Sequence, residues 1–479
     1  MYEGLGLYID GKWRPSHSGR TFEILNPANE EVLGELPIAD ARDLDDALAS
    51  AKKGLEIWRK TTAWERSKVM RKVAELLRER NESIARTLTL ESGKPIAESR
   101  LEVGAAADQF DWFADEARRV YGQTIESRIP NVRNFLRYEP VGVVAAFTAW
   151  NFPVVLVARK IAPALAAGCS IIVKPAEDDP ASGLAIVQAC HDAGVPAGVV
   201  NAVVGDPPFI STHLLASPIT RKVTLTGSIP VGKQLLKLAA DTVKRASMEL
   251  GGHAPFIVFE DADITHAVEI GVKTKFRNNG QVCVSPTRFF VHESKAEDFT
   301  ARFVAGVKKI KIGNGLEAGV DVGPLINKKR LDWINDLVED SRRSGGKIET
   351  GGKRPAGFNS GYYYEPTVIT GLKDDNKIMT TEPFGPVALI TTFKDFNEVM
   401  RRANQLPFGL ASYCFTKSLK TANEAYEQLE TGIVGVNHTA IAAAELPFGG
   451  MKESGLGREG GSLGIHDYLE AKYATMLMN

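Results

Sequence analysis

The alternation of short β-branched runs with helical runs between residues 143 and 250 constrains the fold of this chain more than any other feature. Strands are expected at 143–148, 170–175, 199–204, 223–226 and 246–250, with helices between them at 154–167, 181–193, 208–216 and 231–240. Such strand–helix units build a parallel sheet that is covered by helices on both faces. The pattern therefore predicts a doubly wound, Rossmann-like α/β domain, which binds nucleotides at the carboxyl edge of its sheet.

A second α/β region follows the glycine pair at residues 251–252, where we expect the hinge between the two regions. Strands are expected there at 255–259, 287–293, 362–369, 386–393, 409–415 and 432–437, and helices from 295, at 327–343, at 396–404 and at 419–429. A long helical stretch at about 41–120 precedes the first region. Residues 122–142 are typical of an exposed hairpin, and the tail ends in the strand-like run KYATMLM. A neighbouring subunit often covers unpaired edge strands of this kind.

The charge balance excludes several classes of partner. Lysine and arginine number 58 and aspartate and glutamate 59, a formal net charge of −1, which argues against a dominant nucleic-acid or polybasic membrane surface. The four cysteines form no CxxC motif and no Cys/His cluster, so we expect neither a disulfide framework nor a bound metal. The N-terminus lacks the apolar run of a signal peptide, and no stretch is apolar enough to span a membrane. A reducing, cytoplasmic location is expected.

Two residues are the leading candidates for chemistry on a carbonyl group. Cys283 ends the polar turn NNGQVC, whose free backbone amides could stabilise both a thiolate and a developing oxyanion. Glu249 ends an apolar strand before two glycines, and burial there would raise its pKa into the range of a general base. Taken alone, a cysteine packed under a loop and a glutamate at a strand end explain the same residues.

Other candidates follow the strands of the predicted Rossmann-like sheet. Asn151 could donate its side-chain amide to an oxyanion, or it could be an ordinary turn residue. Lys174 and Glu177 match the needs of an adenosine ribose, although a surface ion pair explains them equally well. The turn with Gly227 and Ser228 joins a strand to a helix and could approach a pyrophosphate.

Together these motifs resemble the aldehyde dehydrogenase superfamily over nearly the whole chain. The family's motifs occur in its order and spacing as WNFP (150–153), KPAE (174–177), TGS (226–228), MELGG (248–252), GQVC (280–283), EPFGP (382–386) and PFGGMKESG (447–455). The resemblance implies an NAD-binding domain with N-terminal helices at 1–121 and 143–250 and a catalytic domain at 251–464. It also implies a small β oligomerisation element at 122–142 and 465–479. A homodimer or a homotetramer is expected, as in other members of the family.

The resemblance also implies roles for individual residues. Cys283 would attack the aldehyde, Asn151 would stabilise the oxyanion, and Glu249 would activate water to hydrolyse the thioester. Lys160 and Glu470 match positions that assist proton transfer in some relatives. The cofactor would be held by Thr148, Trp150, Lys174, Glu177, Gly227, Ser228, Leu250, Glu382 and Phe384. A carboxylate at Glu177 repels a 2′-phosphate, which favours NAD, while Lys174 leaves NADP use possible.

The substrate is expected to be a small aldehyde with a distal carboxylate. Arg159 and Arg277 match arginines that bind this carboxylate in succinate-semialdehyde dehydrogenases, since a guanidinium donates bidentate hydrogen bonds. Succinate semialdehyde is therefore the first candidate. Residues 441–445 read IAAAE where that subfamily tends to have serine, and the surroundings of Cys283 also resemble α-ketoglutaric-semialdehyde dehydrogenases.

Three alternatives to this assignment stay open. A neutral aldehyde is the substrate if the two arginines only form structural ion pairs. A CoA-acylating relative passes the same thioester to CoA, which a hydrolytic base at Glu249 disfavours. A non-catalytic binding or structural protein is the third alternative, and the presence of Cys283, Glu249 and Asn151 together argues against it.

Overall fold

A computed structural model describes residues 2–478 and places an eight-stranded sheet at the centre of the first region. The strand order is β2-β1-β9-β8-β7-β10-β11-β21. The bounds are Leu7–Ile9 (β1), Lys12–Arg14 (β2), Val143–Phe147 (β7), Ser170–Lys174 (β8), Val200–Ala202 (β9), Thr220–Thr226 (β10), Arg245–Glu249 (β11) and Gly455–Leu456 (β21). Strands β9, β8, β7, β10 and β11 pair in parallel, which confirms the predicted Rossmann-like arrangement.

Helices cover this sheet as the strand–helix alternation requires. The N-terminal stretch forms α1 (Ala41–Trp58), α2 (Ala63–Glu79), α3 (Asn81–Ser92) and α4 (Ile96–Glu116), followed later by α5 (Pro153–Ala167), α6 (Pro180–Asp192), α7 (Pro207–Ala216) and α8 (Ile229–Ala240). Helix α5 packs against α4 and β8, and nearly all of its side chains are buried. This burial explains why α5 follows an apolar run rather than an amphipathic pattern.

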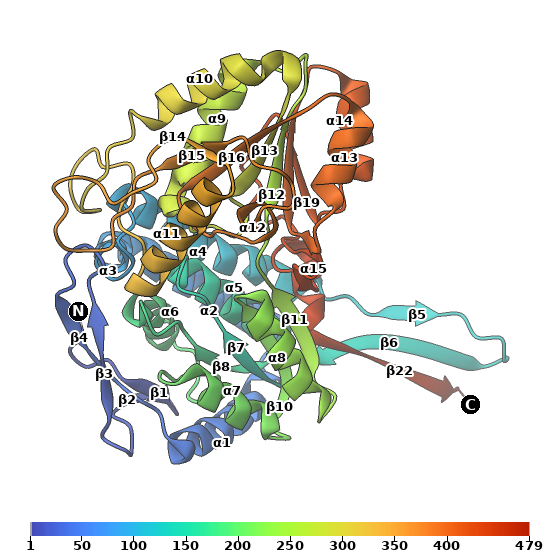
Figure 1. Ribbon diagram of the computed structural model, residues 1–479. Helices are drawn as coiled ribbons and strands as arrows, with labels where there is room; N and C mark the ends of the chain where they lie inside the picture. Colours follow the sequence, from blue (N-terminus) through green and yellow to red (C-terminus); the bar gives the residue numbers. More distant parts are fainter. Residues whose placement is uncertain (1, 479) are drawn as a thin grey trace.

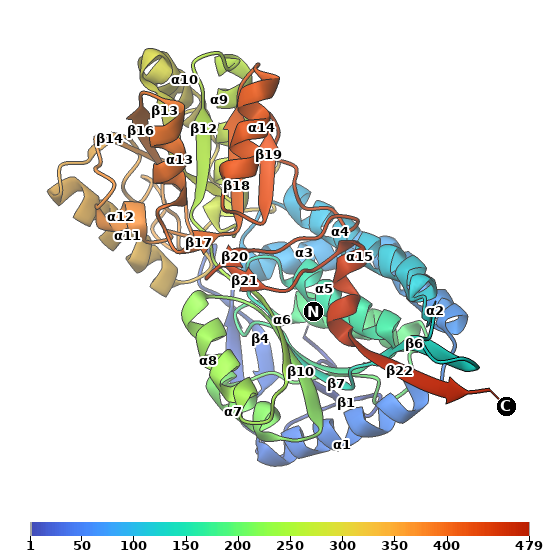
Figure 2. The same cartoon turned by 90° about the vertical axis from the view of Figure 1, so that its right-hand side faces the viewer.

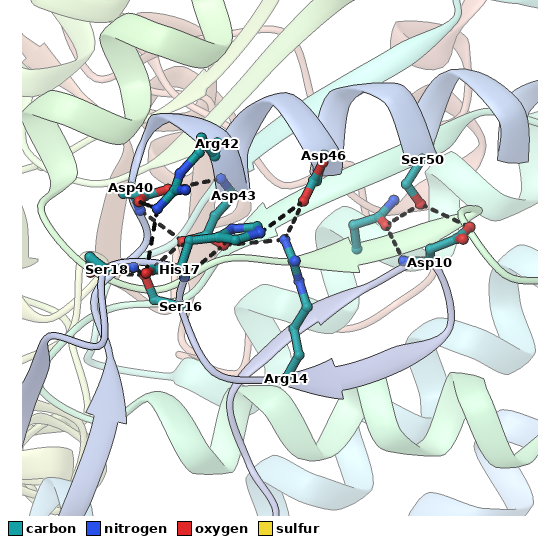
Figure 3. Close-up of polar contacts among 11 residues, drawn as sticks. Asp10, Arg14, Ser16, His17, Ser18, Asp40, Arg42, Asp43, Asp46 and Ser50 are labelled. Atoms are coloured by element: carbon teal, nitrogen blue, oxygen red, sulfur yellow. Dashed lines mark hydrogen bonds and ion pairs between the residues drawn. The ribbon is translucent and has the colours of Figure 1, made fainter.

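The start of α1 is fixed by a polar cluster (Figure 3). Asp40 and Asp43 form a capping box at the start of the helix. The buried Asp43 carboxylate also accepts hydrogen bonds from Ser16 and His17 and forms an ion pair with Arg14. His17, Asp40 and Asp43 lie close enough to share a cation. Their oxygens are already engaged in hydrogen bonds, so the cluster acts as a helix cap that ties the N-terminal strands to α1.

The second region contains a seven-stranded sheet of order β14-β15-β16-β13-β12-β18-β19. Its strands are β12 (Ala254–Val258), β13 (Pro286–His292), β14 (Lys347–Thr350), β15 (Thr367–Thr370), β16 (Val387–Phe393), β18 (Ala411–Phe415) and β19 (Ile433–Val436). Its helices are α9 (Ile264–Phe276), α10 (Ala296–Val307), α11 (Lys328–Arg343), α12 (Lys377–Thr380), α13 (Phe396–Asn404) and α14 (Leu419–Gln428). Figures 1 and 2 show this region stacked on the first one, with both α/β layers visible.

Three strands extend from the body of the molecule as an arm (Figures 1 and 2). They are β5 (Gln123–Ile125), β6 (Val132–Pro140) and β22 (Leu469–Leu477), in the order β22-β6-β5. Strand β22 pairs with β6 over its whole length, from Leu469 opposite Pro140 to Leu477 opposite Val132. The two predicted edge segments, far apart in the sequence, therefore form one antiparallel sheet.

The remaining elements are short. Strands β3 (Thr21–Leu25) and β4 (Val32–Pro37) form a hairpin, and β17 (Phe408–Gly409) pairs with β20 (Met451–Lys452). Short helical turns complete the chain at α15 (Gly461–Gly464), η1 (Ala117–Arg119), η2 (Arg277–Gly280), η3 (Glu293–Lys295) and η4 (His466–Tyr468). Within residues 2–478, no helix combines the length and the apolar character needed to cross a bilayer.

The structure corrects two expectations about elements. The strand predicted at 362–369 is present only as β15, because the backbone of Tyr362 bonds to the loops at Pro27 and Leu325 instead of joining a sheet. Helix α9 was not predicted at all. One short strand does not follow the predicted domain bounds: β21 lies in the segment assigned to the catalytic domain but pairs with β11 in the first sheet. The division into three domains remains a prediction.

Candidate active site

A cavity of about 1070 Å³ lies between the two α/β regions. Its wall is formed by the loops that follow β7, β10 and β11 at the carboxyl edge of the first sheet, together with the Cys283 loop and the EPFGP loop of the second region. This is the edge at which open α/β sheets bind ligands. The strand–helix turns predicted from the sequence therefore meet in one place.

The Cys283 loop has an unusual backbone that aims the cysteine at the cavity. After α9 the chain passes through Asn278 and Asn279 with φ angles of 46° and 55°, and the Asn151 side-chain amide donates to the Gln281 carbonyl at 3.2 Å. Gly280 has no room for a Cβ, which would lie 2.1 Å from the Gly385 carbonyl oxygen. The close approach ties this loop to the EPFGP loop.

Cys283 is partly exposed and belongs to the cavity wall. Burial of the thiol raises its pKa to about 12, and the nearby carboxylates of Glu382 and Glu249 act in the same direction. The sulfur is therefore a neutral thiol at physiological pH in this structure, and an attack on a carbonyl requires a base to take its proton.

Glu249 ends β11, where its neighbour in the ladder is Gly455 of β21. Its side chain is buried and lines the same cavity as Cys283, and neither carboxylate oxygen has a hydrogen-bond partner within residues 2–478. Burial raises the pKa of Glu249 well above its usual value, and the adjacent Glu459 carboxylate raises it further. A buried, unpartnered carboxyl group at this place is suited to accept a proton from a thiol or from water.

Lys160 lies on α5 with no exposed surface and forms an ion pair with Glu459. Glu470, the other residue that the resemblance connects with proton transfer, does not lie beside this lysine. Glu470 lies on β22 and pairs at the surface with Arg245 at 2.7 Å, because β22 runs outward with the arm. The acidic partner of Lys160 is Glu459, which precedes Glu470 in the sequence and also lines the cavity.

The residues predicted to hold the adenosine ribose lie together at the ends of β7 and β8, but they are not among those that line the cavity. Lys174 is buried and donates from Nζ to the Glu177 carboxylate at 2.6 Å and to the Pro175 carbonyl at 3.0 Å. The Thr148 backbone N–H donates to the Lys174 carbonyl, while the Thr148 hydroxyl is buried with no partner in the described chain. The Lys174–Glu177 ion pair, which was the alternative to a ribose site, is therefore present. The Thr148 hydroxyl, which has no partner in the described chain, can still donate a hydrogen bond to a ligand.

The turn after β10 is held against the end of β11. The Gly227 N–H donates to the Glu249 carbonyl at 2.9 Å, and Ser228 is the N-cap residue of α8 in an extended conformation. Both residues line the cavity, as does Leu250, and the free amides at the start of α8 suit a phosphate group. The buried Thr226 hydroxyl also has no hydrogen-bond partner in residues 2–478.

The EPFGP loop brings a carboxylate and a ring to the same wall. The Gly252 N–H donates to the Glu382 carboxylate at 3.1 Å, and burial raises the pKa of Glu382 to about 7. Phe384 has a φ of 50° and meets Trp150 edge to face, with 5.4 Å between the ring centroids. The guanidinium carbon of Arg330 lies 5.8 Å from the Trp150 ring centre and 5.6 Å from that of Phe384. The chemistry of these residues fits a dinucleotide. The carboxylates and the unpartnered threonine hydroxyls suit two riboses, and the amides at the start of α8 suit a pyrophosphate.

The two predicted arginines also lie in the cavity wall. Arg159 is 8% exposed, its guanidinium lies 4.7 Å from the centre of the Phe448 ring, and its Nε has no partner within residues 2–478. Arg277 is more exposed and lies 5.1 Å from the Phe152 ring centre. Within the described chain neither arginine forms an ion pair within 4.0 Å, so both guanidinium groups are free to meet an anion.

Further polar and aromatic residues of this wall lie outside the motifs that predict the site. Glu459, Arg330 and Trp333 line the cavity, and the Trp333 indole nitrogen is buried without a partner in the described chain. Glu459 follows the PFGG motif within the run GREGG, but nothing in its spacing distinguishes it from Glu470. Arg330 and Trp333 belong to a helix whose charged pattern predicts only a solvated face.

Comparison with known proteins places this geometry in a family. The sequence pattern of the Aldehyde dehydrogenase family matches residues 13–474. The chain is 43% identical over 466 residues to a glutarate-semialdehyde dehydrogenase of Pseudomonas putida, covering 97% of this chain and 96% of that protein. It is 44% identical to a mitochondrial succinate-semialdehyde dehydrogenase of Oryza sativa, covering 98% and 88% of the two chains.

Solved structures agree with these sequence matches. A succinate-semialdehyde dehydrogenase from Burkholderia pseudomallei superposes with a TM-score of 0.97 at 44% identity, over 99% of this chain and 98% of that one. The match extends over both α/β regions and the arm, and the motifs that line the cavity are those that define the resemblance. The chain belongs to the aldehyde dehydrogenase family.

Proposed function

We propose that this enzyme oxidises ω-oxo carboxylic acids, with succinate semialdehyde as the first candidate substrate. The observation that carries the proposal is the presence of Arg159 and Arg277, both free of ion pairs in the described chain, in the same cavity wall as Cys283 and Glu249. A guanidinium pair binds a distal carboxylate while the aldehyde end reaches the thiol. Relatives named for glutarate semialdehyde and succinate semialdehyde support this substrate class.

The oxidation requires a nicotinamide dinucleotide, which accepts a hydride from the substrate carbon. Similar solved structures include an NAD+ complex of an aldehyde dehydrogenase from Bacillus cereus at 34% identity. We propose that Lys174 and Glu177 bind the adenosine ribose and that Glu382 accepts from the second ribose, with Thr148, Leu250 and Phe384 packing around them. Trp150, Gly227 and Ser228 would border the pyrophosphate.

The first chemical step is attack on the aldehyde. Glu249 takes the thiol proton, and the Cys283 sulfur forms a bond to the carbonyl carbon. The Asn151 amide and the Cys283 backbone N–H stabilise the resulting oxyanion. The hydrogen bond from Asn151 to the Gln281 carbonyl supports this assignment because it keeps the amide beside the Cys283 loop. A dinucleotide held by Glu382 and Phe384 would take the hydride from the same carbon, so that the acyl group would remain on Cys283 as a thioester.

The second step is hydrolysis. After the thiol proton has passed from Glu249 to Glu459, Glu249 accepts a proton from water and the hydroxide attacks the thioester carbon. The C–S bond then breaks, and Glu249 returns its proton to the leaving sulfur, which releases the carboxylic acid and the thiol. The neighbouring Lys160–Glu459 ion pair can pass the proton onward, since Glu459 lies close enough to raise the pKa of Glu249. A buried base that hydrolyses the thioester favours acid release over transfer to CoA.

The assembled form is a further part of the proposal. The arm exposes Tyr473, Leu477 and Ile125 on strands that lie at the edges of its sheet. Exposed edges with apolar side chains are usually covered by a partner chain. We propose that the arm joins copies of this chain into a homodimer or a homotetramer.

Comparing succinate semialdehyde with butanal tests the substrate assignment. The two aldehydes differ mainly in the terminal carboxylate, and a charge-assisted arginine contact is worth about 1.5–3 kcal/mol. We expect kcat/KM to favour succinate semialdehyde by roughly 10- to 150-fold. Arg159→Gln and Arg277→Gln should each lower this ratio, while Arg100→Gln, which changes an exposed arginine paired with Glu82, should not. A ratio near one in the unmodified enzyme means that it takes neutral aldehydes.

A further inference from the structure

The loop between β7 and α5 is held by a buried ion pair that has no part in the steps proposed above. Lys94 lies between α3 and α4, Glu102 lies on α4, and their side chains are 0% and 1% exposed. The Lys94 Nζ lies 2.5 Å from the Glu102 Oε2. The cost of removing two charges from water largely offsets their attraction, so a pair of this kind adds little to stability. Its contacts with the loop give it another use.

The ion pair fixes both ends of this loop. The Lys94 Nζ donates to the Asn151 backbone carbonyl at 2.8 Å and lies 4.2 Å from the centre of the Phe152 ring. The Val154 backbone N–H donates to the Glu102 Oε1 at 2.9 Å, at the start of α5. A carboxylate at this place satisfies an amide that has no partner inside the helix. The lysine therefore holds the loop and the glutamate holds the first turn of the helix that follows it.

A second donor reaches the same Asn151 carbonyl from the Cys283 loop. The Asn278 side-chain amide donates to it at 2.8 Å, and the Asn278 backbone N–H donates to the Glu98 carboxylate of α4 at 2.9 Å. A carbonyl oxygen has two lone pairs, so the hydrogen bonds from Lys94 and Asn278 use its full capacity. The peptide plane that follows the Asn151 Cα is therefore fixed from two sides.

The segment that carries Lys94 is itself packed tightly against the second region. The Ile96 N–H donates to the Gly315 carbonyl at 2.9 Å. A Cβ at Gly315 would collide with the Lys94 carbonyl oxygen, and one at position 323, also a glycine, would collide with the carbonyl oxygen of the residue before the lysine. Two backbones approach each other so closely only where one residue is glycine. The lysine therefore has little freedom to move away from the loop.

The fixed carbonyl bears on the Asn151 side chain, which the proposed mechanism places at the oxyanion. One of its two amide hydrogens is donated to the Gln281 carbonyl at 3.2 Å, so the other remains for a substrate oxygen. An oxyanion is stabilised by donors held about 2.7–3.1 Å away, and a displacement of about 1 Å can cost about 100-fold in rate. A side chain is aimed this accurately only when its own backbone is fixed.

We propose that Lys94 and Asn278 are positioning residues for the oxyanion site, which act by holding the Asn151 carbonyl, and that Glu102 holds the lysine in place. The proposal rests on the proposed function, in which the Asn151 amide stabilises the oxyanion. Among the described residues, Asn151 and Glu102 line the cavity, whereas Lys94 and Asn278 do not. The two positioning residues set the direction in which Asn151 donates and do not touch the substrate.

A double-mutant cycle with Asn151→Ala tests the proposal. Lys94→Met is combined with Glu102→Gln, so that no unpaired charge remains in the interior. We expect this combination to lower kcat/KM for succinate semialdehyde by about 10- to 100-fold, while the Kd for NAD from calorimetry stays within about twofold. Asn151→Ala alone should lower kcat/KM by about 10²- to 10³-fold. In the Asn151→Ala protein the combination should cost less than about threefold more, because no amide is left to position.

The control is Lys72→Met with Glu75→Gln, which makes the same chemical change in an exposed ion pair on α2 and should keep kcat/KM. An unchanged kcat/KM in the Lys94→Met, Glu102→Gln protein overturns the proposal, and so does an equal loss with and without the Asn151 side chain.

If that protein does not fold, Asn278→Gly decides in the same cycle. It removes the second donor to the Asn151 carbonyl, and glycine readily adopts the φ of 46° found at this position. A loss that is equal in the Asn151→Ala protein overturns the proposal here too. If Asn151→Ala alone keeps the full kcat/KM, the oxyanion assignment of the proposed function fails, and the positioning role fails with it.

Discussion

At the scale of single residues, the surroundings of Cys283, the proposed nucleophile, disfavour the ionised form of its thiol. Burial and two nearby carboxylates raise the pKa of Cys283 to about 12. A thiol in this state reacts slowly with electrophiles at neutral pH, because only the thiolate attacks. The proposed attack on an aldehyde therefore depends on a base that removes the thiol proton.

This gives a prediction for the pH dependence of alkylation. In the protein without cofactor, the rate of Cys283 modification by iodoacetamide should rise about tenfold for each unit between pH 7 and 10, since the thiolate fraction rises in that way below the pKa. Peptide mass spectrometry at each pH gives the rate at Cys283, and the buried Cys190 serves as an internal control. A plateau below pH 9 would show that the thiol ionises far more easily than the structure indicates.

The Lys174–Glu177 pair leads to a prediction about cofactor choice. Glu177 occupies the Lys174 ammonium at 2.6 Å and would repel a 2′-phosphate. Glu177→Ser removes the repulsion and frees the ammonium, so kcat/KM for NADP relative to NAD should rise about tenfold or more, as expected for one charge-assisted contact. Glu126→Ser, an exposed glutamate near the arm, is the matched control. An unchanged preference would remove Glu177 as the discriminating residue.

Most of the site could be predicted at the residue scale because its members sit in short motifs at strand ends. The carboxyl edge of a parallel sheet brings such loops together, so Asn151, Gly227 and Glu249 were placed correctly in one wall. Glu459 could not be distinguished from Glu470 by sequence. Only the direction of β22, which leaves the body toward the arm, decides between them.

At the scale of elements, the sequence predicts strands and helices correctly where the residue pattern is uniform. The prediction fails where strand-like and helix-like features occur in the same segment. Strands β7 to β11 are apolar runs bounded by helices, and the predicted ends of all five lie within a few residues of the observed ends. Helix α9 escaped because its sequence ITHAVEIGVKTKF is rich in β-branched residues, which lower helix propensity. It forms because Asp263 caps it and Phe276 packs into the core of the second region.

The exposed side chains of the arm lead to a prediction about the assembly of the protein. Tyr473 and Leu477 on β22 are 76% and 67% exposed, although both are large and apolar. If a second copy covers them, Tyr473→Asp combined with Leu477→Asp should place charges in the interface and convert the assembly into smaller species. Light scattering after size-exclusion chromatography measures the mass at micromolar concentration.

Lys472→Gln is the control for the arm, since it changes an exposed charge on the same strand without adding one to an apolar surface. It should keep the mass of the unmodified protein. An unchanged mass in the doubly substituted protein would show that β22 is not the contact between copies.

At the scale of the whole molecule, the proposed catalytic groups come from both α/β regions and meet only in the folded chain. Glu249 ends strand β11 and Asn151 lies in the loop after β7 of the first region, while Cys283 and Glu382 belong to loops of the second region. The contacts that align them cross the boundary, as in the Asn151–Gln281 hydrogen bond and the Gly252–Glu382 hydrogen bond. The sequence predicted each region, but the mutual placement depends on contacts between residues more than a hundred positions apart.

The central claim of this account is that Cys283 carries an acyl group which Glu249 releases by activating water. The most direct test uses Glu249→Gln, mixed with NAD and succinate semialdehyde and analysed by intact-protein and peptide mass spectrometry. Because Glu249 serves both steps, we predict that a succinyl thioester forms slowly on Cys283 and then persists, since its hydrolysis is slowed as well, and that steady-state turnover falls by about 10²- to 10⁴-fold. Unimpaired turnover, or an acyl group on a residue other than Cys283, would contradict the account.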